Sequence, residues 1–201
     1  MASREEKKDT KEKKLGWKKS LVLYLHDWIY LLMIILVTFL LVFRVIVVNG
    51  DSMKMTLLDG DYLLLLSNTF YHEPEYGDIV VISKESFDNG SPIVKRVIAA
   101  EGQTVDIDFE NGIVYVDGMA LEEDYINNLT TVDEGISFPL TVKEGCIFVL
   151  GDNRVVSKDS RSPEIGQIDK REVLGKAIYL MIPGTDGGEV ARDNSRIGVI
   201  K

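Results

Sequence analysis

The sequence predicts a mainly β protein, with a single N-terminal transmembrane helix followed by an antiparallel, β-barrel-like domain that carries a small inserted β lobe. Three observations predict this fold. One apolar segment near the N-terminus is long enough to cross a bilayer, many short apolar runs follow it, and turns rich in glycine, asparagine and aspartate separate those runs. With 201 residues, the chain has room for one anchor and one globular domain.

An uncharged apolar run at residues 28–43 marks the membrane segment, and apolar neighbours extend it to residues 21–45. A helix that spans the bilayer needs about 20 apolar residues, so we expect residues 21–45 to form an anchor. No small-x-small cleavage site follows the run, which argues against a signal peptide that is removed. A buried helix of a soluble protein is the alternative.

Charges in front of this segment predict its orientation. Because positively charged flanks stay in the cytoplasm, we expect residues 1–20 to be a cytoplasmic basic tail and residues 46–201 to be extracytoplasmic. The first 15 residues are charged and lack apolar periodicity, so we expect them to be disordered. The lysines that carry the orientation argument are Lys7, Lys8, Lys11, Lys13, Lys14, Lys18 and Lys19.

Beyond the anchor, short apolar runs between turn dipeptides predict strands of a β domain at residues 46–183. Within it, residues 102–145 are expected to form the inserted lobe, with a long polar loop at 122–137. Residues 184–201 are a polar, Gly-rich C-terminal tail. The expected strands are residues 61–66, 77–82, 92–98, 104–107, 112–116, 146–150 and 173–182.

Composition argues against several functions. Residues 45–201 carry 14 Lys/Arg and 27 Asp/Glu, so the domain lacks the clustered cations that nucleic-acid binding needs. Cys146, the only cysteine, lies in an apolar run and is expected to be a small buried hydrophobe. The only histidines are His26 and His72, so neither a metal cluster nor a Ser-His-Asp triad is favoured. We expect no metal and no cofactor.

Three polar stretches follow the anchor and carry the functional signal. They are residues 49–57 (NGDSMKMTL), 95–97 (KRV) and 151–161 (GDNRVVSKDSR). They resemble the conserved boxes of bacterial type I signal peptidases: Ser-Met-x-Pro-Thr-Leu, Lys-Arg, and Gly-Asp-Asn-Arg-x-x-Ser-x-Asp-Ser-Arg. Residues 76–81 are similar to the family's remaining strand box. The resemblance covers about residues 20–183, and its third box matches at every fixed position.

The resemblance implies a membrane-bound serine endopeptidase with Ser52 as nucleophile and Lys95 as general base. A lysine can take the serine proton only when it is neutral, and an apolar strand face shared with Ile93 and Val97 would lower its pKa. Arg96 alternates to the opposite face and is expected to be structural.

Supporting roles also come from the resemblance. It implies that Ser157 holds the amine of Lys95 and that Asp159 and Arg161 pair beneath that turn, with Asp152 in the same network. A plain surface salt bridge between Asp159 and Arg161 is the open alternative.

Two positions depart from the family pattern. Met55 stands where the family has proline, which removes a rigid residue from the turn after the nucleophile. Gly50 stands where some relatives carry a serine that helps to hold the oxyanion, so the backbone N–H of Ser52 is expected to serve alone or with a water.

The implied partners are secretory preproteins, whose signal peptides carry small residues before the cleavage site, and membrane lipid. The implied location is the cell membrane, with a single pass and a cytoplasmic N-terminus. The single anchor and small lobe are similar to the Gram-positive type. One alternative is a self-cleaving Ser/Lys protease of the repressor type, although such proteins carry a DNA-binding module instead of an anchor. Another is an anchored inactive homologue that acts as a binding or assembly factor, for which Met55 is the local hint.

Overall fold

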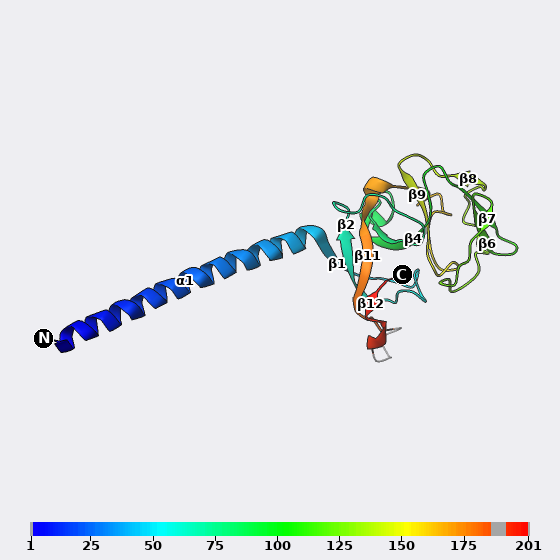
Figure 1. The fold of residues 1–201 in the computed structure, drawn as a ribbon. Helices are drawn as coiled ribbons and strands as arrows, with labels where there is room; N and C mark the ends of the chain where they lie inside the picture. The colour runs from blue at the N-terminus through cyan, green and yellow to red at the C-terminus, as the bar shows by residue number, and fades with distance from the viewer. Residues whose placement is uncertain (1, 186–191, 201) are drawn as a thin grey trace. The chain divides into compact units, whose positions relative to one another are not determined.

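The structure, a computed structural model, describes residues 2–185 and 192–200, with the side chains of residue 17 and of the residues from 19 onward (Figure 1). The chain divides into two compact units, Met1–Leu41 and Val42–Lys201. The first is a single helix and the second is a β domain, which confirms the predicted mainly β fold with one N-terminal apolar helix.

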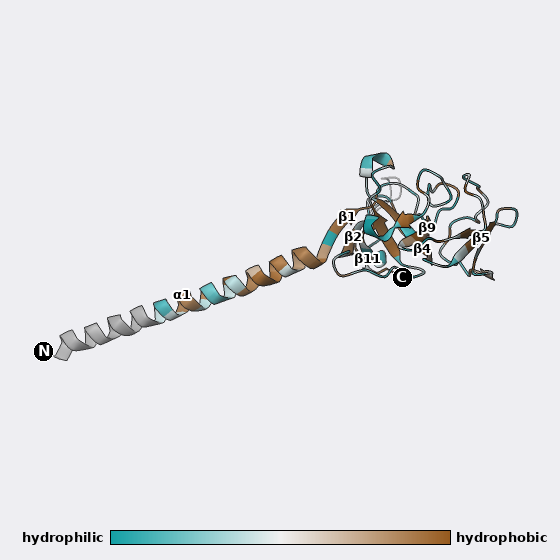
Figure 2. Cartoon of the chain, turned by 90° about the horizontal axis from the view of Figure 1, so that it is seen from above, coloured by the Kyte–Doolittle hydropathy of each residue, from teal (hydrophilic) through white to brown (hydrophobic). Residues whose placement is uncertain are grey.

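Helix α1 spans Ala2–Val42. Its segment Lys19–Val42 has 24 residues with a mean hydropathy of 2.2, and none of its most apolar window is buried within the chain. Figure 2 shows the change from polar to apolar residues along this helix. The segment is therefore long and apolar enough to cross a membrane, and it fits an anchor.

Both ends of α1 differ from the sequence-based expectation. The helix begins at Ala2, so the expected disorder of the first 15 residues is wrong. Lysine and glutamate, which dominate that stretch, are good helix formers even without an apolar face. At the other end the helix stops at Val42, because Phe43–Val47 pairs with the next strand instead. The consecutive β-branched residues Val45, Ile46 and Val47 of this strand favour that pairing.

The main sheet is antiparallel and open, so the barrel-like domain is a half-barrel. Its strands lie in the order β1-β2-β11-β3-β4-β9-β10, and β12 also pairs with β11 (Figure 1). The strand β4 lies in the centre, between β3 and β9. These strands are β1 (Phe43–Val47), β2 (Tyr62–Ser67), β3 (Ile79–Ile82), β4 (Ile93–Ala100), β9 (Cys146–Leu150), β10 (Ile168–Asp169), β11 (Val173–Ile182) and β12 (Gly198–Val199).

A second antiparallel sheet, in the order β7-β6-β5-β8, forms the predicted inserted lobe. An edge-to-face contact of Phe138 with Phe148 of β9 ties this lobe to the main sheet, and a second one joins Phe138 to Phe109 within the lobe. The chain between β7 and β8 is the expected polar loop. The strands are β5 (Thr104–Asp108), β6 (Ile113–Val116), β7 (Met119–Ala120) and β8 (Leu140–Thr141). In the described residues, 3-10 turns lie at Asp88–Gly90, Lys170–Glu172 and Asn194–Arg196.

The core of the domain consists of three apolar clusters, and β4 contributes to each of them. Val94 belongs to the first, Ile98 to the second and Val97 to the third. Each fully buried aliphatic side chain of this kind stabilises the fold by about 2 kcal/mol. Because β4 is covered on both faces, Lys95 and Arg96 in its middle are only 3% and 2% exposed. The fold therefore buries two adjacent cations.

Candidate active site

Ser52 lies in a tight turn that follows β1. The side chains on either side of the turn, Met53 and Leu57, are buried in the first core cluster, and the Leu57 N–H donates to the Met53 carbonyl at 2.8 Å. The loop at residues 151–161, the third polar stretch, forms hydrogen bonds with this turn. There the N–H of Asn153 donates to the Ser52 carbonyl and its side-chain amide donates to the Asp51 carbonyl, both at 3.0 Å. Packing and hydrogen bonds together fix the position of the serine.

Lys95 reaches Ser52 from the centre of β4. Its Nζ donates to Ser52 Oγ at 2.8 Å. Burial lowers the pKa of Lys95 from the usual 10.5 to about 8. The negative charges of Asp159, Asp152 and Glu134 oppose this shift without cancelling it. The structure thus brings together the two residues that the sequence proposed as nucleophile and base.

Ser157 does not make the hydrogen bond that the resemblance implied. It is only 1% exposed, yet in the described residues its Oγ has no hydrogen-bond partner, Lys95 included. The Nζ of Lys95 is engaged with Ser52 instead. Ser157 nevertheless lies close by. A Cβ added at Gly151 would stand 2.1 Å from Ser157 Oγ and 2.6 Å from the Ser52 carbonyl oxygen, so only glycine permits this approach.

Asp152 forms a network separate from the one expected. Its fully buried carboxylate accepts two hydrogen bonds from Arg96, at 2.9 and 2.8 Å, and one from the Thr56 hydroxyl at 2.5 Å. Asp152 therefore joins the strand that carries Lys95 to the turn that carries Ser52. It was expected in the network of Asp159 and Arg161 instead. Sequence reasoning missed Thr56, although the threonine of the first box was a signal for it.

Asp159 and Arg161 form a buried pair, so the alternative of a surface salt bridge is wrong. Both side chains are 0% exposed, and two hydrogen bonds of 2.8 and 2.9 Å join them. Arg161 also donates to the carbonyls of Arg154 and Ser157, and the Gly151 N–H donates to Asp159 at 3.0 Å. The pair closes the loop of the third polar stretch upon itself.

The polar loop of the inserted lobe packs on this loop, which sequence reasoning missed. Glu123 pairs with Arg154 at 2.5 Å, and Glu134 lies 3.7 Å from Arg161. Burial raises the pKa of the Glu134 carboxyl above its ordinary value, and the negative charge of Asp159 raises it further. The acidic residues of the loop were visible in the sequence, but their arginine partners were not.

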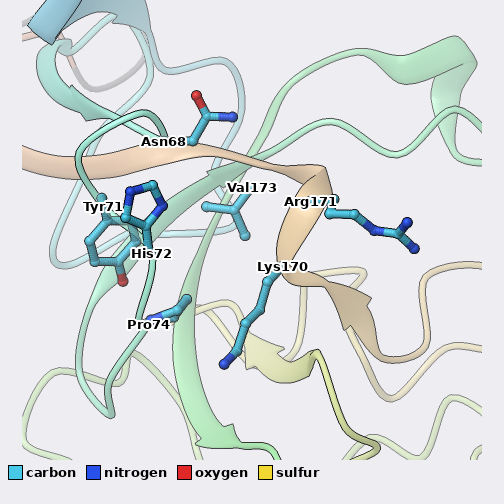
Figure 3. Close-up of a pocket in the computed structure, with 7 residues that line it drawn as sticks. All are labelled: Asn68, Tyr71, His72, Pro74, Lys170, Arg171 and Val173. Atoms are coloured by element: carbon cyan, nitrogen blue, oxygen red, sulfur yellow. The ribbon is translucent and has the colours of Figure 1, made fainter.

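The remaining candidates lie elsewhere. His72 lines a cavity of about 340 Å³ that shares no residue with the Ser52–Lys95 pair (Figure 3). Among the described residues, no group of three or more His, Cys, Asp or Glu is placed to hold a metal. Cys146 is half-buried and free. The other residues that line the cavity are Asn68, Tyr71, Pro74, Lys170, Arg171 and Val173.

A buried lysine within hydrogen-bonding distance of a serine, held in a β domain, is an arrangement suited to a serine-type hydrolase. Comparison with known proteins agrees with this class. Residues 21–182 match the family described as signal peptidase, peptidase S26. The chain therefore belongs to the signal peptidase family S26, a family of serine-type peptidases.

Individual relatives fit this assignment. The chain is 36% identical over 155 residues to a probable signal peptidase I-1 of Synechocystis, covering 71% of this chain and 73% of that protein. It is 33% identical over 186 residues to a signal peptidase I of Bacillus licheniformis, covering 87% and 95%. A crystal structure of a signal peptidase I from Enterococcus faecalis is also similar, with 33% identity, a TM-score of 0.42, and coverage of 52% of this chain and 96% of that one.

Proposed function

We propose that the chain is a membrane-bound serine endopeptidase that removes N-terminal signal peptides from exported preproteins, with Ser52 as nucleophile and neutral Lys95 as general base. The observation that carries this proposal is the 2.8 Å contact between Ser52 Oγ and the Nζ of a lysine that is only 3% exposed. The family's boxes and the named relatives support the same reaction.

Burial gives Lys95 its chemistry. With a pKa of about 8, roughly one lysine in ten is neutral at pH 7, compared with fewer than about one in a thousand at the usual value. The neutral amine accepts the proton of the Ser52 hydroxyl, and Oγ attacks the carbonyl carbon of the scissile peptide. A base with a pKa near the working pH also returns its proton readily.

The later steps use the same pair. The tetrahedral intermediate carries a negative oxygen, for which the Ser52 N–H is the proposed donor, since Gly50 offers no side chain. The Lys95 ammonium then protonates the leaving amine, the C–N bond breaks, and an acyl ester on Ser52 remains. A water that loses its proton to Lys95 hydrolyses this ester and restores the serine.

The supporting residues hold this geometry without touching the scissile bond. Asp152 couples the Ser52 turn to the Lys95 strand through Thr56 and Arg96. Asp159 and Arg161 stabilise the loop that brings Ser157 beside the pair. The proposed role of Ser157 is to orient the Lys95 amine once the serine hydroxyl is committed to substrate.

Substrates and location follow from the same proposal. The helix Lys19–Val42 holds the enzyme in the cell membrane, with the lysine-rich N-terminus in the cytoplasm and the domain outside. Its substrates are secretory preproteins with small residues before the cleavage site. Nothing in the proposed reaction uses nucleic acid, a metal or a cofactor.

An anchored inactive homologue is the second candidate, and Met55 is the observation in its favour. Met55 is 67% exposed and has φ +89°, a conformation that proline cannot adopt because its ring fixes φ near −65°. The turn after the nucleophile therefore follows a path incompatible with the family's proline. The contact between Ser52 and Lys95 nevertheless forms on this path, which favours catalysis.

The test is processing of purified preproteins in detergent by the wild type, Ser52→Ala and Lys95→Ala, with the cleavage site mapped by mass spectrometry. We expect cleavage after a small-x-small motif by the wild type and its loss in both variants. Retention in Lys95→Ala would remove Lys95 as the base. An inactive wild type whose cellular role survives Ser52→Ala would support the binding factor.

A further inference from the structure

The C-terminal segment contacts the nucleophile turn through a buried carboxylate. Asp61, which precedes β2, is 0% exposed, and its oxygens accept hydrogen bonds from Leu58 at the end of the turn and from Gly184 beyond β11. Arg196 completes the site with a two-pronged contact of 2.9 and 2.7 Å. One carboxylate thus joins the end of the turn to Gly184 and Arg196, which lie far from it in the sequence, and a planar guanidinium is the group that fits it best.

Arg196 also reaches the turn itself. Its Nη2 donates to the carbonyl of Thr56 at 3.3 Å. The hydroxyl of the same threonine donates to Asp152, which binds the arginine next to Lys95. Thr56 is therefore held from two directions, by its hydroxyl toward the strand of the base and by its carbonyl toward the C-terminal segment.

The C-terminal segment is built to place Arg196 there. Asp193 caps the 3-10 turn Asn194–Arg196 by accepting hydrogen bonds from the N–H and the hydroxyl of Ser195, at 3.0 and 2.6 Å. Strand β12 then pairs with β11, and Ile200 packs against the core cluster that holds Met53. The described part of the tail is thus an ordered element next to the nucleophile.

The turn needs such support because of its backbone. Met55 has φ +89°, a conformation that is costly for a residue with a Cβ and that persists only where the surroundings impose it. Met55, Thr56 and Leu57 line a cavity of about 270 Å³ together with Arg196 and residues 198–200 of the C-terminal segment. The strained residue and the tail therefore face the same space.

We propose that Arg196 is a positioning residue for the reaction: through Asp61 and the Thr56 carbonyl, the C-terminal segment holds the turn in the conformation that brings Ser52 Oγ to Lys95. This role rests on the proposed function. Loss of the contact lets the turn relax at Met55 and moves Oγ away from the amine. Because small displacements of reacting groups are costly, we expect kcat to fall roughly 10- to 100-fold, whereas KM, set by substrate contacts elsewhere, stays within about twofold.

The experiment compares Arg196→Gln and Arg196→Lys with the wild type in detergent, and Arg192→Gln, an exposed arginine of the same segment, is the control. Preprotein cleavage gives kcat and KM, and hydrogen–deuterium exchange reports on the peptide covering residues 53–58. We expect Arg196→Gln to lower kcat and to accelerate exchange in 53–58 while β3 and β4 exchange as in the wild type. The Arg196→Lys variant should retain part of the wild-type kcat, and the Arg192→Gln control should match the wild type in both kcat and exchange.

Two results would overturn the proposal. In the first, Arg196→Gln keeps the kcat and the exchange of the wild type. In the second, exchange accelerates throughout the domain and the melting temperature falls in step with kcat, which would make Arg196 a general stabiliser of the fold. If the wild type cleaves no preprotein, the proposed function fails, but the exchange of residues 53–58 still decides whether Arg196 holds the turn.

Discussion

Lys95 and Arg96 are adjacent, equally buried and differently used. For Arg96, burial alone would lower the pKa, but the hydrogen bonds and the charge of Asp152 raise it above its usual value. Among the described residues, no carboxylate forms an ion pair with Lys95, and its Nζ contacts the neutral hydroxyl of Ser52. Burial therefore prevails, and the pKa falls to about 8. Arg96 therefore stays charged and supports the structure, whereas Lys95 is able to lose its proton.

The charge of Glu134 should tune this base. Its carboxylate helps to stabilise the Lys95 ammonium, so Glu134→Gln removes a negative charge and lowers the lysine pKa. We expect the acidic limb of the pH profile of kcat/KM to move to lower pH. Asp133→Asn, an exposed neighbour in the same loop, is the control. A limb that stays in place, or that moves to higher pH, would contradict the electrostatic role of Glu134.

Lys95 should also be costly for stability. Its folded pKa lies below its unfolded value, so the unfolded chain binds more protons between about pH 8 and 10.5, and stability rises with pH across that window. Below pH 8 the full cost applies, on the order of 3 kcal/mol. We expect Lys95→Met to be inactive yet more stable than the wild type at pH 7, with the gap closing by pH 10.5.

Denaturant unfolding in detergent at these two pH values measures the effect. A variant that is less stable than the wild type at pH 7 would show that the lysine contributes packing or hydrogen bonds that outweigh its desolvation. If the difference in unfolding free energy between Lys95→Met and the wild type is the same at both pH values, the proton of Lys95 is not involved.

At the scale of elements, the loop at residues 151–161 is fixed by the polar loop of the inserted lobe. Arg154 is 0% exposed and its partner Glu123 is 6% exposed, so Glu123→Gln leaves a buried guanidinium without its counter-charge. We expect a loss of about 3–5 kcal/mol in the free energy of unfolding. The exposed pair of Lys158 and Glu164 is the matched control, and Glu164→Gln should cost less than about 1 kcal/mol. Equal losses of unfolding free energy in Glu123→Gln and Glu164→Gln would mean that the polar loop does not stabilise the loop at residues 151–161.

Gly151 makes the closest approach within the same loop. A Cβ there would collide with Ser157 and with the Ser52 carbonyl, both of them buried or held by hydrogen bonds. We expect Gly151→Ala to lower kcat/KM at least about 100-fold, because the collision displaces the nucleophile. Gly198→Ala is the control, because a Cβ there meets nothing within 4 Å and Gly198 does not have a positive φ. Similar rates for Gly151→Ala and the wild type would contradict this packing.

Sequence reasoning predicted the elements better than their connections. The long apolar runs form strands, because valine and isoleucine favour the extended, pleated conformation of a sheet. The two-residue strands β7, β8, β10 and β12 carry no such pattern, and only tertiary pairing makes them strands. Asp152 was assigned to the wrong network for a related reason. Spacing does not say which of Arg96, Arg154 and Arg161 a given carboxylate meets once the loop folds back.

At the scale of the whole molecule, the basic N-terminal segment and the apolar helix predict a single orientation in the membrane. Protease added to intact cells stripped of their wall should therefore digest the β domain and leave the anchor. A protein with a cytoplasmic reporter of known topology is the control for leakage. A domain that resists digestion until the membrane is dissolved would place it in the cytoplasm and would contradict the proposed access to exported preproteins.

The proposed reaction depends most on a lysine acting as the base. The most direct test is the pH dependence of kcat/KM for wild-type cleavage of one preprotein. We expect kcat/KM to rise with unit slope and to level off near pH 8, the pKa of Lys95. A profile that levels off near pH 6.5 would contradict Lys95 as the base, and a rate independent of pH from 6 to 9 would contradict a titrating base altogether.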